Sequence, residues 1–280
     1  MKKTHFSLLV FAFSIMIYSC SKNEKAGIPD QKNNIPPDVI TKVENLGFNS
    51  NGIKKYKDGY LVEGDIYLTD KDFSKQGTDK ILQIAETEQY RTTNKVTGLP
   101  RTLSVYISSS FSSSFVKAAD TMVARYNALG LKLKFKRVAD AATANITIET
   151  MYEEPDGSGG ITLGVSAGFP DATGNPAKSF ALNTHPDAYG TNPDVKWLAS
   201  VMAHEVGHAI GFRHTDYMNR YYSCPWEGKR SKESKGTDGA IQIPGTPSKP
   251  DKGSWMLACS DGNDRPFNAN DIVSLQYLFK

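Results

Sequence analysis

HEVGHAIGFRH, at residues 204–214, places three histidines and one glutamate within eleven positions, and the rest of the chain is best interpreted from this stretch. Residues four apart on a helix share one face, so His204 and His208 can direct ring nitrogens at one metal ion from roughly 2.0 to 2.1 Å. Glu205 lies about 60° around the helix from His208, given a turn of roughly 100° per residue. The spacing therefore predicts a metal site with a carboxylate beside the ion.

The residues that follow complete the predicted site. Gly211 comes three positions after His208, where a helix can end at positive φ, a conformation that glycine adopts without a Cβ penalty. The chain can then turn and supply His214 as a third ligand. Three protein ligands leave a fourth position for water, which is typical of catalytic Zn²⁺. A core helix that carries histidines by chance is disfavoured, because three of the five histidines in the chain fall here.

A zinc-bound water would define the reaction. Zinc lowers the pKa of its bound water toward about 7 and polarises a scissile carbonyl. Glu205 would take the water's proton during attack and deliver it to the leaving amine. The sequence therefore predicts one catalytic zinc ion held by His204, His208 and His214, with Glu205 as general base and acid in peptide-bond hydrolysis.

The motif also carries a family resemblance. HEVGHAIGFRH resembles the elongated zinc signature of the metzincin peptidases, which includes a downstream Met-turn. Gly253 to Met256 offer that turn, and the resemblance implies that Met256 lies beneath the zinc without binding it. Within the metzincins, residues 99–280 are most similar to the HEIGH-type bacterial metallopeptidases. This similarity rests on MAHEVGHAIGFRHTD, IPGTP at 243–247, SWMLAC at 254–259 and the ending RPFNANDIVSLQYLF.

The resemblance implies an α/β (α+β) catalytic domain with a twisted mixed sheet, an active-site helix, a Met-turn and a C-terminal helix. One of its strands should be the edge along which metzincin substrates lie as an added strand. Apolar periodicity predicts the same order of elements without the resemblance. It indicates strands at 103–107, 131–135, 146–148, 161–169 and 180–182, a helix at 115–126 that completes a βαβ unit, and a final helix from Asn270 or Asp271.

The N-terminus indicates export. Lys2 and Lys3 precede an uncharged run at 6–18 that fits a signal peptide and is too short to span a bilayer, so residues 1–19 should be removed. Ile17 to Cys20 resembles a bacterial lipobox, which implies that Cys20 is lipidated and that residues 20–40 form a flexible tether. We expect an outer-membrane or cell-surface lipoprotein, or a periplasmic or secreted protein if the lipobox is not used.

The two remaining cysteines predict a disulfide. Cys224 and Cys259 form an even pair in an oxidising compartment. A bridge would join the segment after His214 to the segment just past Met256. Zinc thiolate ligation is the disfavoured alternative, because the histidines already complete a catalytic set.

The segment before the catalytic domain, residues 41–98, is a small N-terminal or pro-like unit. Its run YLVEGDIYL, at 60–68, resembles the FxGD element of astacin pro-segments, in which the aspartate blocks the zinc; Val62 stands at the phenylalanine position. The resemblance implies a latent zymogen with Asp65 at the water site and cleavage around residues 91–101. The other interpretation is an ordinary turn aspartate in a structural subdomain.

Charge and composition limit the partners. The 33 basic and 30 acidic residues give a net charge of +3, and loss of Lys2 and Lys3 leaves +1, so nothing favours nucleic acid. Protein or peptide substrates and a monomer are expected. Calcium could bind near Asp156, Asp171 and Asn175, but turn chemistry explains them equally well. The alternative functions are an adhesin or binding protein on a metzincin scaffold, and a zinc hydrolase acting on a non-peptide bond.

Overall fold

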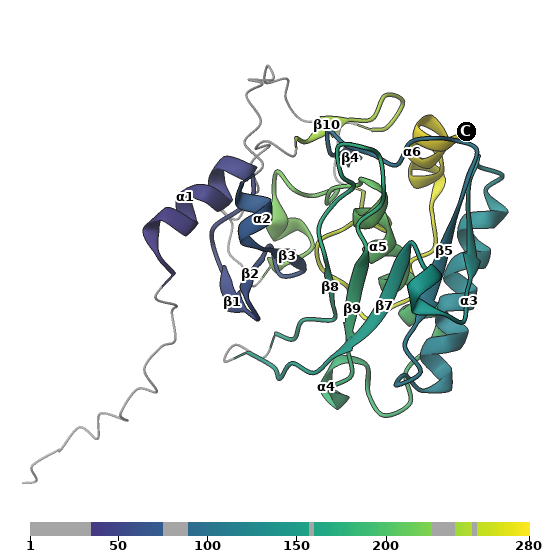
Figure 1. Ribbon diagram of the computed structural model, residues 1–280, viewed down its shortest axis with the longest axis horizontal. Coiled ribbons are helices and arrows are strands. Elements are labelled where there is room, and N and C mark those ends of the chain that lie inside the picture. The colour runs from purple at the N-terminus through teal and green to yellow at the C-terminus, as the bar shows by residue number, and fades with distance from the viewer. Residues whose placement is uncertain (1–34, 75–88, 157–159, 226–238, 248–250) are drawn as a thin grey trace, which may run out of the picture. The chain divides into compact units, whose positions relative to one another are not determined.

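An eight-stranded mixed sheet organises the chain in the computed structural model, which describes residues 35–74, 89–156, 160–225, 239–247 and 251–280. The strand order is β1-β2-β3-β8-β9-β7-β5-β6, and a separate ladder joins β4 to β10 (Figure 1). The strands are β1 (Lys54–Tyr56), β2 (Gly59–Val62), β3 (Ile66–Leu68), β4 (Tyr90–Arg91), β5 (Arg101–Ile107), β6 (Leu133–Arg137), β7 (Ile146–Met151), β8 (Gly164–Ser166), β9 (Ser179–Asn183) and β10 (Ile241–Gln242). The helices are α1 (Pro37–Leu46), α2 (Asp70–Phe73), α3 (Ser113–Ala128), α4 (Pro186–Tyr189), α5 (Val195–Ile210) and α6 (Ala269–Phe279), with short 3-10 turns at Ala141–Thr143 and Arg220–Tyr222.

The predicted βαβ unit is confirmed as β5, α3 and β6. β5 and β6 pair in parallel, with Leu103 opposite Phe135, and α3 supplies the crossover. β7 pairs in parallel with both β5 and β9, whereas β8 runs antiparallel to β9. The sheet is therefore mixed, as the resemblance implied, and it changes direction at β8. Of the run expected as a strand over 161–169, only Gly164–Ser166 forms β8.

Helix α5 carries the HEVGH sequence and is buried on all sides. The Asp194 side chain caps its first turn by accepting from the backbone N–H groups of Lys196 and Trp197, at 2.9 and 2.8 Å. Gly211, with φ at 115°, ends the helix in the left-handed conformation that its sequence position predicts. Every residue from 198 to 210 is buried, so the part of α5 that carries the histidines is enclosed on all sides.

The C-terminal helix begins slightly earlier than predicted. The Asn268 side chain accepts from the backbone N–H groups of Asn270 and Asp271, and the Asp271 carboxylate accepts in return from the Asn268 N–H. This capping box satisfies the first-turn donors. The cap therefore lies at Asn268, ahead of the start expected at Asn270 or Asp271.

The N-terminal strands join the same sheet but contribute to a small core of their own. β2 and β3 form a hairpin, and β3 pairs in parallel with β8 through Ile66 and Ser166. Strands β1–β3 form one edge of the sheet, and helices α1 and α2 lie beside them (Figure 1). The core beneath them comprises Val39, Val43, Leu46, Phe48, Ile53, Val62, Ile66 and Leu68. Phe169 reaches this core from the catalytic part and stacks on Phe48, with ring centroids 6.0 Å apart.

Residues 90–96 are tied into the catalytic part of the chain. β4 pairs with β10, Thr92 N–H donates to the Gly211 carbonyl, and Val96 N–H donates to the Ile210 carbonyl. These bonds satisfy carbonyls at the end of α5. Cleavage around residues 91–101, as the sequence suggested, would cut this support, so the structure argues against that position.

Several N-terminal expectations fall outside the structure. The expected signal peptide and Cys20 lie outside the described residues. The tether expected over residues 20–40 overlaps α1, because the chain is already helical from Pro37, where proline suits the first turn. Within the described part of the chain, no helix has the length and apolar character needed to cross a membrane.

Candidate metal centre and active site

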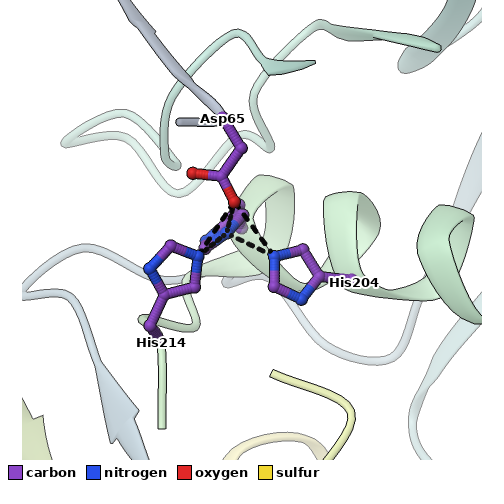
Figure 2. Close-up of side chains that lie close together, drawn as sticks. Asp65, His204 and His214 are labelled. Carbon is purple, nitrogen blue, oxygen red and sulfur yellow. Dashed lines mark hydrogen bonds and ion pairs between the residues drawn. The ribbon is translucent and has the colours of Figure 1, made fainter. Parts of the chain in front are cut away.

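Three imidazoles converge on one point beside α5. The Nε2 atom of His208 lies 3.0 Å from that of His204 and 3.2 Å from that of His214. The Oδ2 atom of Asp65 lies 3.3, 3.6 and 2.9 Å from the Nε2 atoms of His204, His208 and His214 respectively. Figure 2 shows the Asp65 carboxylate pointing into the space between the rings. All four side chains are buried, and no other metal-binding group of three or more His, Cys, Asp or Glu occurs in the described ranges.

This arrangement fits a tetrahedral metal ion. Four ligand atoms, each about 2.0 to 2.1 Å from a tetrahedral zinc, are separated from one another by roughly 3.3 Å. The separations found here run from 2.9 to 3.6 Å. Two facing imidazole nitrogens that both carry lone pairs repel each other, and a cation between them removes that repulsion. The donor set and its spacing therefore fit zinc.

Backbone carbonyls orient two of the rings. His204 Nδ1 lies 3.0 Å from the Trp255 carbonyl oxygen, and His208 Nδ1 lies 2.9 Å from that of Phe212. A ring that donates through Nδ1 presents an Nε2 lone pair, which is the form that binds metal. Burial also lowers the pKa of His208 to about 4, which keeps this imidazole neutral. His214 differs, because its Nδ1 faces Nη1 of Arg220 at 3.3 Å.

Glu205 lies beside the cluster in a buried environment. Its Oε2 atom has no hydrogen-bond partner, and neither does Oδ1 of Asp65. Burial, reinforced by the charge of Asp65, raises the pKa of Glu205 well above its usual range. The carboxylate is so close to β8 that a Cβ atom at Gly164 would overlap it. Glu205 therefore lies next to the four converging residues and is not one of them.

Asp65 is ionised despite its burial. Desolvation opposes its charge, but the close contacts of its carboxylate with His214, His204 and His208 hold its pKa well below the usual range. A carboxylate among three imidazoles is itself a suitable metal ligand. Its side chain comes from the hairpin turn between β2 and β3, far from α5 in sequence.

Met256 lies in the buried layer under α5. A Cβ atom at Gly207 would overlap the Met256 sulfur and the Trp255 ring, so this layer packs directly against the helix between the first two histidines. The Met256 carbonyl accepts from Thr215 N–H at 2.8 Å, next to His214. Met256 is fully buried.

A disulfide ties the segment after the third histidine to the segment after Met256. The predicted Cys224–Cys259 bond is present, with Cα atoms 5.5 Å apart, and zinc thiolate ligation is thereby excluded. Asp216 reinforces the link, because it accepts from Ala258 N–H at 2.9 Å and from the Ser223 hydroxyl at 2.5 Å. Asp216 therefore links the two loops through hydrogen bonds.

Other residues occupy positions that sequence reasoning missed or left open. Three buried charged residues beside the site were missed: Glu63, Arg213 and Arg220. Arg213 directly precedes the third histidine, but nothing in its sequence neighbourhood shows that its partner is far upstream. Asp171 accepts from the backbone of Thr173 and Asn175 and so forms an ordinary turn, which leaves calcium without support.

Comparison with known proteins agrees with the site. The solved structure of myroilysin is similar, with 13% sequence identity and a TM-score of 0.43, over 68% of this chain and 98% of that chain. No curated protein matches the chain. The model of the dual-action HEIGH metallo-peptidase family matches residues 61–279, and so includes Asp65 as well as the three histidines. Because this match covers most of the sequence, the chain belongs to the HEIGH metallopeptidase family, and its resemblance to the metzincin zinc peptidases is confirmed.

Proposed function

We propose that this metallopeptidase is an exported zinc endopeptidase that is made as a latent precursor. The observation that carries the proposal is the convergence of three histidine Nε2 atoms and the Asp65 Oδ2 atom on one point, with Glu205 beside them. The histidines form a three-ligand catalytic set, and the aspartate occupies the remaining position. No side chain of the predicted catalytic set is missing, which favours an enzyme over an adhesin.

The protein's own residues have clear parts in peptide hydrolysis. His204, His208 and His214 would hold zinc, which when bound supplies Lewis acidity and an acidified water. Glu205 would serve as the proton acceptor for such a water, because its buried Oε2 makes no hydrogen bond. Its raised pKa makes it a better proton acceptor than an exposed carboxylate. The same carboxyl group then delivers the proton to the leaving amine.

Two contacts support latency. The Asp65 carboxylate lies where the fourth ligand of the ion would lie, which is the place of the water in an active site. In addition, β3 pairs with β8, and Ser166 N–H donates to the Asp65 carbonyl at 2.6 Å. Without β3, β8 would be an edge strand next to Glu205, where an extended peptide can add to the sheet. The hairpin therefore competes with both water and substrate.

Activation would then require removal of the hairpin. We place the cleavage after β3 and before Gln89, because a cut there separates Asp65 from the catalytic part of the chain. It also leaves β4 and the bonds from Thr92 and Val96 to the end of α5 intact. The β3–β8 pairing involves a single residue pair, so the released hairpin is held mainly by side-chain contacts.

Metal content and cleavage test the activity. The chain from residue 21 is purified and activated by limited proteolysis, its zinc stoichiometry is measured, and casein and a peptide library are assayed with and without a chelator. We expect one zinc per chain and chelator-sensitive internal cleavage. Glu205→Gln should retain zinc and lose at least about a thousandfold in kcat, as expected when a general base is lost from a metal site. Near wild-type activity in Glu205→Gln would rule out this mechanism.

The membrane anchor is a separate proposal that rests on the sequence around Cys20. Metabolic labelling with a fatty acid should mark the wild-type protein, and Cys20→Ala should remove the label. Unlabelled wild-type protein in the soluble fraction would instead favour the periplasmic or secreted form.

A further inference from the structure

The hairpin between β2 and β3 inserts two acidic side chains, and only Asp65 approaches the Nε2 atoms of the three histidines. Val62 pairs with Ile66, so Glu63, Gly64 and Asp65 form the connecting turn. Glu63 and Gly64 both have positive φ, at 55° and 86°, which turns the chain sharply at this point. Asp65 enters the imidazole cluster, while Glu63 enters a neighbouring buried place and is only 4% exposed.

Two arginines of the catalytic part contact Glu63. Nη2 of Arg213 lies 3.6 Å from the Oε1 atom of Glu63, and Nη2 of Arg220 donates to the Glu63 backbone carbonyl at 3.0 Å. Oε2 of Glu63 is 4.0 Å from Nδ1 of His214. Arg213 thus contacts the side chain of Glu63 and Arg220 contacts its backbone, next to the histidine cluster. Within the hairpin's own segment, Asn49 N–H also donates to Oε1, at 2.9 Å.

Arg213 is held from two directions. Its guanidinium lies beside the stacked pair of Phe48 and Phe169, 5.0 Å from the centroid of the first ring and 5.9 Å from that of the second. It also donates to the carbonyls of Gly47 and Gly239, at 3.3 Å each. Phe48 and Gly47 belong to the N-terminal segment, whereas Phe169 and Gly239 belong to the catalytic part. Removal of the N-terminal segment would therefore take away the contacts of Arg213 with Phe48, Gly47 and Glu63, and it would keep those with Phe169 and Gly239.

We infer that Arg213 and Arg220 form a substrate subsite that binds an acidic side chain once the hairpin has left, and that Glu63 is its built-in occupant. The inference rests on the proposed latency and cleavage. A buried guanidinium strongly favours an anionic partner over a neutral one. Glu63 is only two residues from Asp65 and lies in the same turn, next to the histidine cluster. The acidic residue should therefore lie within two positions of the cleaved bond.

Matched peptides test this subsite in the activated protein. The cleaved bond of a library substrate is located by mass spectrometry, and glutamate is then placed in turn at each nearby position and compared with glutamine. At one position we expect glutamate to raise kcat/KM about tenfold or more over glutamine, the usual effect of a hydrogen bond to a charged group. Arg213→Gln should reduce this ratio to near one, and Arg213→Lys should restore part of it.

The ratio of kcat/KM for the glutamate peptide to that for the glutamine peptide distinguishes loss of the subsite from a general loss of folding or activity. Arg125→Gln removes a different arginine, one that pairs with Asp264 at 2.7 Å, and it should leave the ratio unchanged. In the Glu205→Gln background, the dissociation constants of the glutamate and glutamine peptides give the same comparison without any cleavage. Equal binding of the two peptides at every position, or an acidic preference that survives Arg213→Gln, overturns the inference. Binding of the acidic peptide without cleavage by the wild type would instead refute the proposed endopeptidase and leave the subsite standing.

Discussion

The Oδ2 atom of Asp65 lies 2.9 Å from Nε2 of His214, although 149 residues separate the two in sequence. A carboxylate and an imidazole at this distance share either a proton or a metal ion. Because the Nε2 atoms of His204 and His208 also face this carboxylate, a metal ion satisfies all four groups at once. The hairpin therefore contributes Asp65 to a four-residue cluster that is able to bind a metal ion.

Replacing Asp65 should release the blocked position. In the full-length precursor, Asp65→Ala removes the fourth ligand, and we expect peptide cleavage to rise at least about tenfold, since a charge-assisted contact contributes roughly 1.5–3 kcal/mol. A fluorogenic peptide assay on uncleaved chain measures this. Asp58→Ala is the matched control, because Asp58 lies in the preceding turn and bonds to Tyr67. If both variants behave like the wild type, Asp65 is only a structural turn residue.

Gly164 should be intolerant of a side chain. A Cβ atom there would overlap the Glu205 carboxylate, so Gly164→Ala must displace either the general base or β8. We expect at least a tenfold fall in kcat, with a cost in stability of about 1–3 kcal/mol for overpacking. Gly253→Ala adds the same methyl group where the nearest atom is the end of the Asn268 side chain, and it should keep activity. Unchanged kcat in Gly164→Ala would show that Glu205 has room to move.

The disulfide should stabilise the fold and hold the lower loops together. Cys224 and Cys259 are 35 residues apart, and closing a loop of that length contributes about 4 kcal/mol in the chain-entropy model. Urea unfolding of the double alanine variant, at saturating zinc, should show a loss of this order. Reduction of the disulfide in the wild type should lower the free energy of unfolding by a similar amount. A loss below about 1 kcal/mol would contradict the chain-entropy estimate.

Asp271 should make stability depend on pH. Burial raises its pKa to about 7, against hydrogen bonds from Asn268, Gln89, Trp255 and Ser254 that lower it. A carboxyl group whose pKa is higher in the folded than in the unfolded state stabilises the fold when it is protonated. For Asp271 this stabilisation has its full value below about pH 4. That contribution is lost as the pH rises through about 7, and the total is on the order of 4 kcal/mol.

Comparison with a neutral variant isolates this effect. The free energy of unfolding is measured from pH 4 to 8 for the wild type and for Asp271→Asn, both at saturating zinc. The free energy of unfolding of the wild type, relative to that of Asp271→Asn, should decrease as the pH rises. Parallel curves would mean that the donors around Asp271 keep it ionised throughout the range.

Local sequence determined the elements that carry the site. The four-residue spacing of His204 and His208, the cap at Asp194 and the glycine at 211 specify a helix with two ligands on one face, because these signals act between near neighbours. The alternation in β5 and β6 predicted the βαβ unit for the same reason. The start of α6 was displaced because the capping side chain of Asn268 precedes the apolar pattern.

Tertiary structure alone decided what closes the site. The resemblance at residues 62–65 singled out Asp65, but only packing shows its carboxylate among the three imidazoles, and only packing shows Glu63 against Arg213. Nor does the sequence reveal that β3 covers β8, since that pairing joins segments 100 residues apart through a single bridge. Such contacts depend on how distant hydrophobic faces come together, and no short-range periodicity encodes them. The sequence therefore determined the candidate ligands and the proposed general base, whereas the folded chain determined which groups lie opposite them.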